Sequence, residues 1–235
     1  MRILGVIPAR YNSTRFPGKP LANILGKSMI QRVYNQACKA QILDKVIVAT
    51  DNDEIYTHVN GFAGNVLITN PNHQTGTERC NEVIEKINND TFDIIINIQG
   101  DEPFIKPQQI TELCSLFKDS SIQIATLAKE ITSTEDIKNP NTTKVIFDKN
   151  MIAQSFSRKL SVQKTYYKHI GIYGYRTQIL SEITKLEMTK NEMKENLEQL
   201  RWLDNGYKIK VGITVHESQA VDKPDDILKI ETKMR

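Results

Sequence analysis

The segment from Pro8 to Pro20 gathers residue types that bind a polyanion. It contains the cations Arg10, Arg15 and Lys19, two hydroxyl side chains and a Pro-Gly pair. Guanidinium groups match phosphate oxygens in pairs and a lysine adds a point charge, so a phosphate-bearing ligand fits this segment best. The alternative is a solvated basic loop, but the Pro-Gly punctuation favours a shaped binding loop.

The sequence lacks the common motifs of several enzyme classes. It has no Gly-x-Gly-x-x-Gly, and Gly26-Lys27-Ser28 has Leu21 where a Walker A motif needs a glycine. These gaps argue against a P-loop ATPase and a dinucleotide dehydrogenase. The sequence also lacks the Gly-x-Ser-x-Gly motif that is typical of serine hydrolases. The four histidines show no spacing typical of zinc sites.

Two carboxylates occupy positions where a metal could bridge to phosphate. Asp101 follows an apolar segment and Gly100, and Asp222 precedes Pro224. Mg²⁺ takes one or two protein carboxylates together with phosphate oxygens and waters. The alternative for Asp101 is a turn or cap residue. For Asp222 the alternative is an N-cap of the helix that begins at Pro224.

Two further polar positions leave both a functional and a structural interpretation open. Gly76 and the start of the following helix could approach a base or a phosphate, although Thr77 could equally be a plain N-cap. His169 lies in an apolar, tyrosine-rich segment, and a lone histidine in a strand is usually structural.

Alternating strands and helices must position these residues. In the first half the hydrophobic patterns predict strands at 2–7, 46–50, 65–69 and 93–98, and helices at 28–40, 53–61, 77–89 and 107–117. In the second half they predict strands at 122–131, 144–148, 151–157, 168–176 and 208–215, and helices at 177–186, 192–204 and from Pro224. This order predicts an α/β fold whose halves share one mostly parallel, mixed sheet sandwiched by helices, with ligands beyond the carboxyl ends of its strands.

Composition excludes several other classes. The chain has 235 residues, 31 Lys and Arg against 28 Asp and Glu, and this surplus of three is too small to predict nucleic-acid binding. No segment approaches the roughly 20 apolar residues of a membrane span, and the N-terminus is charged too early for a secretory signal. Cys38, Cys80 and Cys114 all fall on apolar positions of helical patterns, which predicts reduced, buried thiols in a cytoplasmic protein.

Several blocks of sequence together resemble the CMP-Kdo synthetases, which are 3-deoxy-manno-octulosonate (Kdo) cytidylyltransferases. The blocks run in order over nearly the whole chain, at 7–20, 49–51, 73–79, 97–103, 139–141, 156–158, 169–176, 197–201 and 221–224. The resemblance implies a nucleotide-diphospho-sugar transferase fold of Rossmann-like type with a smaller strand-rich lobe. It further implies one domain over 1–235, with a CTP-binding half at 1–120 and a sugar-binding, dimerising half at 121–235.

The resemblance also implies a reaction in which CTP and Kdo give CMP-Kdo and pyrophosphate, for lipopolysaccharide or capsule synthesis. It assigns the nucleotide to Ala9, Arg10, Ser13, Arg15, Lys19, Gly76, Arg79 and Asp101, with Lys19, Arg10 and Asp101 as the catalytic set. It assigns Mg²⁺ to Asp101 and Asp222. It assigns the acidic sugar to Gln99, Arg158, His169, Glu198 and Gln199, in a homodimer without nucleic-acid or membrane partners.

The chain departs from the family pattern in two segments. Only ten residues separate Arg158 from His169, and an Ile-Pro-x-x-Arg segment usual there is missing. Residues 188–195 carry Lys190, Asn191 and Lys194 where the family has proline and apolar positions. Both changes fall in the sugar-binding half, so 8-amino-Kdo or another 2-keto-3-deoxy acid is an alternative acceptor. A non-catalytic nucleotide binder is a further alternative, against which the intact Lys19 and both carboxylates argue.

Overall fold

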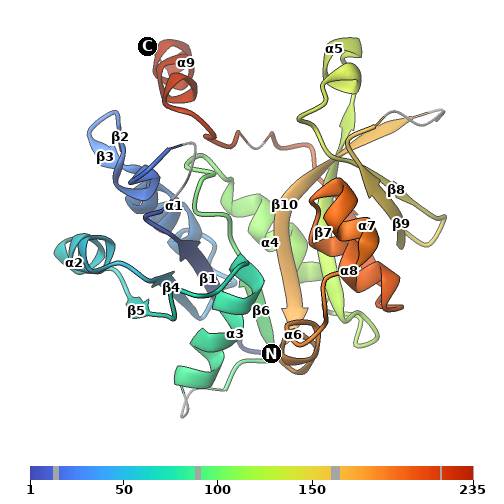
Figure 1. The fold of residues 1–235 in the computed structure, drawn as a ribbon, viewed down its shortest axis with the longest axis horizontal. Coiled ribbons are helices and arrows are strands. Elements are labelled where there is room, and N and C mark those ends of the chain that lie inside the picture. Colours follow the sequence, from blue (N-terminus) through green and yellow to red (C-terminus); the bar gives the residue numbers. More distant parts are fainter. Residues whose placement is uncertain (13–15, 88–90, 160–164, 218, 235) are drawn as a thin grey trace.

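A nine-stranded mixed sheet forms the centre of the computed structural model, which describes residues 1–12, 16–87, 91–159, 165–217 and 219–234 (Figure 1). Its main order is β11-β7-β10-β6-β1-β4-β5, and β8 and β9 branch from β10. The strands are β1 (Ile3–Ala9), β4 (Lys45–Thr50), β5 (Val66–Ile68), β6 (Ile94–Asn97), β7 (Ile124–Ile131), β8 (Lys144–Phe147), β9 (Ala153–Ser157), β10 (Tyr166–Arg176) and β11 (Ile209–Ile213).

Helices cover both faces of this sheet, and a two-stranded hairpin lies outside it. The helices are α1 (Met29–Cys38), α2 (Asp53–Gly61), α3 (Gly76–Lys86), α4 (Pro107–Leu116), α5 (Thr134–Lys138), α6 (Thr177–Ile183), α7 (Lys190–Glu195), α8 (Gln199–Asp204) and α9 (Pro224–Met234). The remaining elements are the 3-10 helix η1 (Lys19–Leu21) and the hairpin strands β2 (Asn23–Ile24) and β3 (Lys27–Ser28).

Strand β1 shows how the sequence builds two cores. Its side chains alternate between the faces of the sheet, as the period of two in a strand requires. Ile3 and Ile7 pack with α1, α2 and α4 on one face. Leu4 and Val6 pack with α3, α6 and α8 on the other. The unbroken apolar run therefore marks a strand that is buried on both sides, as expected for a parallel sheet covered by helices.

Strand β10 joins the two halves of the chain. It runs antiparallel to both β6 and β7, whereas β1 pairs in parallel with β4 and β6. The predicted α/β fold with one shared, mostly parallel sheet is thus confirmed. The pairing of β10 with β7 shifts register between Ile170 and Tyr173, which marks a bulge in the strand.

The chain after β11 returns across the sheet to the N-terminal half. Helix α9 lies beside the β2–β3 hairpin (Figure 1). Val221 and Ile230 form a small core there with Ile24 and Met29. The carboxylate of Glu231 also accepts a hydrogen bond from the Leu25 amide at 3.2 Å. This return brings Asp222 next to the loop that carries Asp101.

The single helix expected over 192–204 is wrong, because the segment forms two helices, α7 and α8. Asn196 ends α7 in the left-handed conformation, with φ of 52°. Asparagine adopts this conformation more readily than most residues, and a left-handed residue commonly ends a helix. The interruption places Leu197 and Glu198 between the two helices and turns them toward the sheet.

The expectation of three buried thiols is also wrong in one case. Cys80 and Cys114 are buried, whereas Cys38 is exposed; all three are free. The core-facing residues Val33 and Ala37 lie on another side of α1, and Cys38 ends the helix about 100° farther around it. Within the described ranges, none of the helices is long and apolar enough to cross a membrane.

Candidate active site

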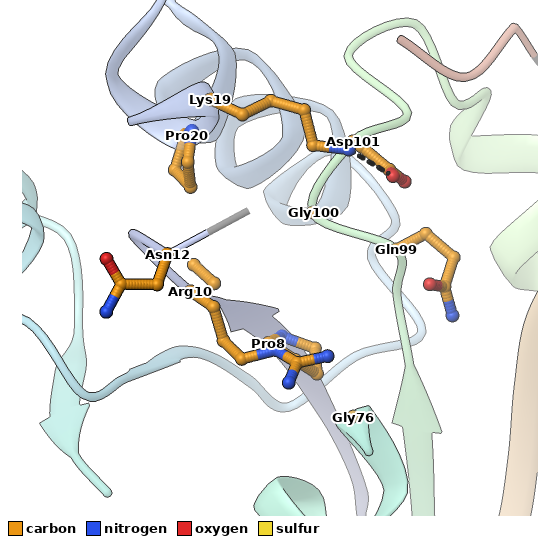
Figure 2. A pocket seen from close by; sticks show the side chains of 10 residues that line it. Pro8, Arg10, Asn12, Lys19, Pro20, Gly76, Gln99, Gly100 and Asp101 are labelled. Atoms are coloured by element: carbon orange, nitrogen blue, oxygen red, sulfur yellow. Dashed lines mark hydrogen bonds and ion pairs between the residues drawn. The ribbon is translucent and has the colours of Figure 1, made fainter. Parts of the chain in front are cut away.

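A cavity of about 410 Å³ opens where β1 and β6 end (Figure 2). The predicted residues Ala9, Arg10, Lys19, Gly76 and Asp101 all line it. It is also lined by Pro8, Asn12, Pro20, Gln99 and Gly100. The carboxyl ends of neighbouring parallel strands bring these distant segments together, as the strand order predicts.

The loop after β1 is closed by its own backbone. The amide of Gly18 donates to the carbonyl of Tyr11 at 2.9 Å. Gly18 has φ of 68°, a left-handed conformation that glycine adopts at little cost. Lys19 and Pro20 then start η1, which points Lys19 toward the cavity. Two residues predicted to bind the nucleotide, Ser13 and Arg15, lie outside the described residues.

Lys19 links the two loops that border the cavity. Its Nζ donates to Asp101 Oδ2 at 2.7 Å and to the carbonyl of Val221 at 3.0 Å. Figure 2 shows its side chain extending from the loop after β1 to Asp101 on the loop after β6. A lysine held by a carboxylate at a cavity wall is fixed in place, and the third N–H of its ammonium group is left to donate to an anionic ligand.

Gly100 allows these two loops to approach each other closely. A Cβ atom at this position would lie 2.5 Å from the backbone oxygen of Pro8, which is far inside van der Waals contact. At Gly76 a Cβ would lie 3.2 Å from the Pro8 ring, so this glycine also keeps the first turn of α3 near the cavity. The helix begins with Thr75 as its N-cap, which accepts from the Glu78 amide at 3.1 Å. The N-cap interpretation of Thr77 is therefore wrong.

Of the two carboxylates predicted to bind Mg²⁺, Asp101 lines the cavity, whereas Asp222 is not among its lining residues. The Val221 amide donates to the backbone oxygen of Asp101 at 2.9 Å, which sets Asp222 beside the Asp101 loop. The amides of Asp222 and Lys223 both donate to Asp226 at 3.0 Å, so Asp226 supplies the capping carboxylate before α9. Carboxylate oxygens are the ligands that Mg²⁺ prefers, and the assignment of the ion to Asp101 and Asp222 stays a prediction.

A second cavity of about 310 Å³ adjoins the first. The two cavities share Gly76, Gln99 and Asp101, so they form one continuous cleft. Four of the five residues predicted to bind the sugar line the second cavity: Gln99, His169, Glu198 and Gln199. Gln99 is held in place because its Nε2 donates to the Gly171 carbonyl at 2.9 Å.

Arg158, the fifth of these residues, points elsewhere. Its Nη1 donates to the carbonyl of Glu195 at the end of α7, at 2.6 Å. Ser157 next to it also contacts the Glu195 carboxylate, at 3.3 Å. In this arrangement Arg158 joins β9 to α7, and its assignment to the sugar stays a prediction.

Arg79 is also not exposed in the cleft. Its side chain is 0% exposed, and its Nη2 donates to Asp51 Oδ2 at 2.8 Å. Its Nη1 donates to the hydroxyl of Thr69 and to the carbonyl of Asn70. Through these hydrogen bonds the guanidinium holds the segment that leads into α3. Its predicted contact with the nucleotide stays a prediction.

The predictions from sequence missed four polar residues of the second cavity: Thr77, Asn97, Glu102 and Tyr173. Asn97 Oδ1 and Nε2 of Gln199 are buried without a hydrogen-bond partner among the described residues. Buried polar atoms usually have partners, so two such atoms around one cavity indicate a polar ligand. The sequence signal that could have identified Asn97 is its place at the end of the apolar run at 94–97.

Glu198 is the most perturbed carboxyl of the cleft. Burial raises the pKa of Glu198 to about 7, against the lowering effects of hydrogen bonds from Thr77 and Thr75 and of the charge of Arg201. Thr77 Oγ1 donates to Glu198 Oε2 at 2.9 Å. The residue sits in the break after Asn196 and next to the buried Tyr173 and Tyr175. Near neutral pH it can exchange a proton or accept two hydrogen bonds.

The raised pKa of Glu198 predicts a pH-dependent stability. In the unfolded chain this carboxyl has its ordinary pKa of 4.5, so the folded state binds the proton more tightly. Its contribution to the unfolding free energy is fully present below pH 4.5 and is lost as the pH rises to about 7. At about 1.4 kcal/mol per pKa unit, the loss between pH 5 and pH 8 is about 2 to 3 kcal/mol.

Urea unfolding of the wild type and of Glu198→Gln at pH 5 and pH 8 checks this. We expect the substitution to remove that part of the pH dependence, so Glu198→Gln gains about 2 to 3 kcal/mol relative to the wild type between the two pH values. The other titrating groups are common to both proteins and cancel in the difference. Parallel pH profiles for the two proteins would show that Glu198 titrates normally.

The chain matches the family profile described as Cytidylyltransferase over residues 4–209. It is 49% identical to 3-deoxy-manno-octulosonate cytidylyltransferases of Parabacteroides distasonis and Bacteroides thetaiotaomicron, over 97% and 98% of this chain and 96% and 97% of those proteins. It is 42% identical to an 8-amino-3,8-dideoxy-manno-octulosonate cytidylyltransferase of Shewanella, over 100% of this chain and 99% of that protein.

Solved structures support the same assignment. A CMP:2-keto-3-deoxy-manno-octonic acid synthetase in complex with CTP is 36% identical, with a TM-score of 0.93, covering 100% of this chain and 98% of that one. A 4-diphosphocytidyl-2C-methyl-D-erythritol synthase of Anaerococcus prevotii shares the fold alone, at 12% identity and a TM-score of 0.64, over 99% of this chain and 98% of that one. The chain is thus an enzyme of the nucleotidyltransferase class and belongs to the 3-deoxy-manno-octulosonate cytidylyltransferase family.

Proposed function

We propose that the protein transfers CMP from CTP to the anomeric 2-hydroxyl of Kdo and releases pyrophosphate. The observation that carries this proposal is the continuous cleft, because one part has a cationic wall and the adjoining part has neutral and acidic polar groups. The first part suits a triphosphate, and the second suits a polyhydroxylated acceptor. Their shared wall at Gln99 and Asp101 is where the two substrates would meet.

The reaction forms one bond and breaks one. The anomeric oxygen attacks the α-phosphorus of CTP, the bond from that phosphorus to the β-phosphate oxygen breaks, and the hydroxyl proton goes to solvent. Such transfers depend on positioning and on neutralising charge more than on covalent help from the protein. Arg10 and Lys19 would hold the phosphates in line, and Gly76 would let the nucleotide approach the start of α3.

Asp101 and Asp222 would hold Mg²⁺ in this scheme. When bound, the ion would neutralise charge on the phosphate oxygens and orient the reacting groups. The hydrogen bond from Lys19 would hold the Asp101 carboxylate in the position where it would bind the ion.

His169 and Glu198 would bind hydroxyl groups of the acceptor. Burial lowers the pKa of His169 to about 3, so its ring is neutral at physiological pH. The ring lies between Phe156 and Tyr173, with centroid distances of 5.1 and 5.2 Å. A neutral imidazole and a carboxyl group that titrates near pH 7 are better suited to bind the hydroxyl groups of the acceptor sugar than to bind its carboxylate.

Pyrophosphate release tests the proposal. Purified protein is incubated with CTP and Mg²⁺, and with Kdo, 8-amino-Kdo or no sugar. We expect turnover with Kdo well above the blank. Turnover with only 8-amino-Kdo would mean that the acceptor is the amino sugar in the name of the Shewanella relative. No release with either sugar, from protein that binds CTP, would contradict the proposed transfer.

The proposal also includes the oligomeric state of the enzyme, its location in the cell and the use of its product. The family suggests a homodimer formed through residues 121–235 and a cytoplasmic location, with the product used for lipopolysaccharide or capsule. Size-exclusion chromatography with light scattering would measure the first of these directly.

A further inference from the structure

Thr126 on β7 makes an unusual set of contacts behind the second cavity. It is 0% exposed, and its Oγ1 lies 3.1 Å from the carbonyl oxygen of Ile170 and 2.8 Å from that of Ile172. The same oxygen lies 3.0 Å from Nε2 of His169. These carbonyls belong to the bulged part of β10, so a single hydroxyl serves the bulge and the histidine together.

The chemistry of this cluster decides where its protons are. A carbonyl oxygen can only accept a hydrogen bond, so a hydroxyl proton turned toward His169 would leave the lone pairs of Thr126 Oγ1 facing two carbonyl oxygens at 3.1 and 2.8 Å. This repulsion assigns the one hydroxyl proton of Thr126 to Ile170 or Ile172. The oxygen is then left as an acceptor toward His169. Nε2 of His169 must therefore carry the ring proton and donate it to Thr126.

This donation has a consequence on the cleft side of the ring. In a neutral imidazole only one nitrogen is protonated, so Nδ1 carries a lone pair and accepts. Among the residues that the structure describes, Nδ1 of His169 has no hydrogen-bond partner, and His169 lines the second cavity. A hydroxyl of a bound acceptor is the fitting partner for it.

We propose that Thr126 is a positioning residue for the acceptor site: it holds the β10 bulge, fixes His169 in the Nε2-protonated form and so makes His169 accept a hydrogen bond from an acceptor hydroxyl. The acceptor part of this inference rests on the proposed function, whereas the position of the ring proton does not. Thr126 touches no substrate itself and acts through His169.

Substitutions at Thr126 separate the hydroxyl from the shape of the side chain. Thr126→Val keeps the branched shape and removes the hydroxyl, and Thr126→Ser keeps the hydroxyl. We expect Thr126→Val to raise the KM for the acceptor sugar about tenfold, in line with the cost of leaving buried polar groups unpaired. The KM for CTP should stay within about twofold, and Thr126→Ser should restore the acceptor KM to near the wild-type value.

A matched control is Thr184→Val at the end of α6. Its hydroxyl also donates to a backbone carbonyl, that of Leu180, at 3.1 Å. This substitution should leave the KM of both substrates unchanged. A rise in acceptor KM for Thr126→Ser as large as for Thr126→Val would overturn the proposal, because the hydroxyl would then not be the active feature.

Nitrogen-15 NMR of the histidine rings provides a test that needs no turnover. With His169 assigned by its loss in His169→Gln, we expect the wild type and Thr126→Ser to show a protonated Nε2 and a bare Nδ1 over pH 6–8. A protonated Nδ1 in the wild type overturns the proposal even if Thr126→Val does not fold. If the wild type fails to use Kdo while Nε2 is protonated, the proposed function fails and the Thr126–His169 arrangement stands.

Discussion

Asp101→Asn is expected to lower kcat by at least about a thousandfold and to leave the fold intact. Removal of one preorganised group at a site of developing charge typically costs a hundred- to a thousandfold, and Asp101 combines a proposed metal ligand with the anchor of Lys19. The fold is retained because the contact that joins this loop to the C-terminal segment is made by the Asp101 backbone oxygen.

Steady-state kinetics with CTP and Kdo, together with circular dichroism and CTP binding, checks this expectation. The matched control is Asp53→Asn, an exposed carboxylate in the first turn of α2. That variant should keep wild-type kcat. Near-wild-type turnover by Asp101→Asn would contradict the role of this carboxylate in the cleft.

The substitution Lys19→Ala is expected to lower kcat/KM for CTP by roughly a hundred- to a thousandfold. Lys19 reaches from the loop after β1 to Asp101 on the loop after β6, and it also contacts the carbonyl of Val221. Its loss removes a positive charge from the proposed phosphate site and leaves the Asp101 carboxylate without this partner. Both effects make the free energy of binding a triphosphate in the cleft less favourable.

Lys27→Ala, at the exposed position of strand β3, provides the control for net charge. It removes one positive charge near the same end of the chain and should keep kcat/KM within about twofold of the wild type. Equal losses in the two variants would mean that general charge attraction, and not the position of Lys19, governs the reaction.

Much of the fold and of the phosphate side could be predicted from the sequence because the signals there are local. The unbroken apolar run of β1 marks a buried strand, and the Pro-Gly pair after it marks a shaped loop. The carboxyl ends of parallel strands then bring Lys19 and Asp101 together, although 82 residues separate them in the chain. Strand order was enough to place the two segments at the same edge of the sheet, whereas the hydrogen bond between Lys19 and Asp101 was not predicted.

The sugar side was less predictable because its geometry depends on contacts between distant residues. Nothing local shows that Arg158 turns to the Glu195 carbonyl or that Arg79 is buried against Asp51. The same holds for Glu198, whose pKa rises because three-dimensional packing removes water from it. Even the family resemblance assigned these side chains by type, and the position of Glu198 depends on the helix break at Asn196.

Isotope tracing tests the central claim most directly. Kdo labelled with oxygen-18 at its anomeric hydroxyl is incubated with CTP, Mg²⁺ and the protein, and both products are analysed by mass spectrometry. The account predicts that the label is retained in the bridging oxygen of CMP-Kdo and that pyrophosphate is unlabelled. A sugar nucleotide with less label than the unreacted Kdo recovered from the same mixture, or label in the pyrophosphate, would contradict attack by the anomeric oxygen on the α-phosphorus.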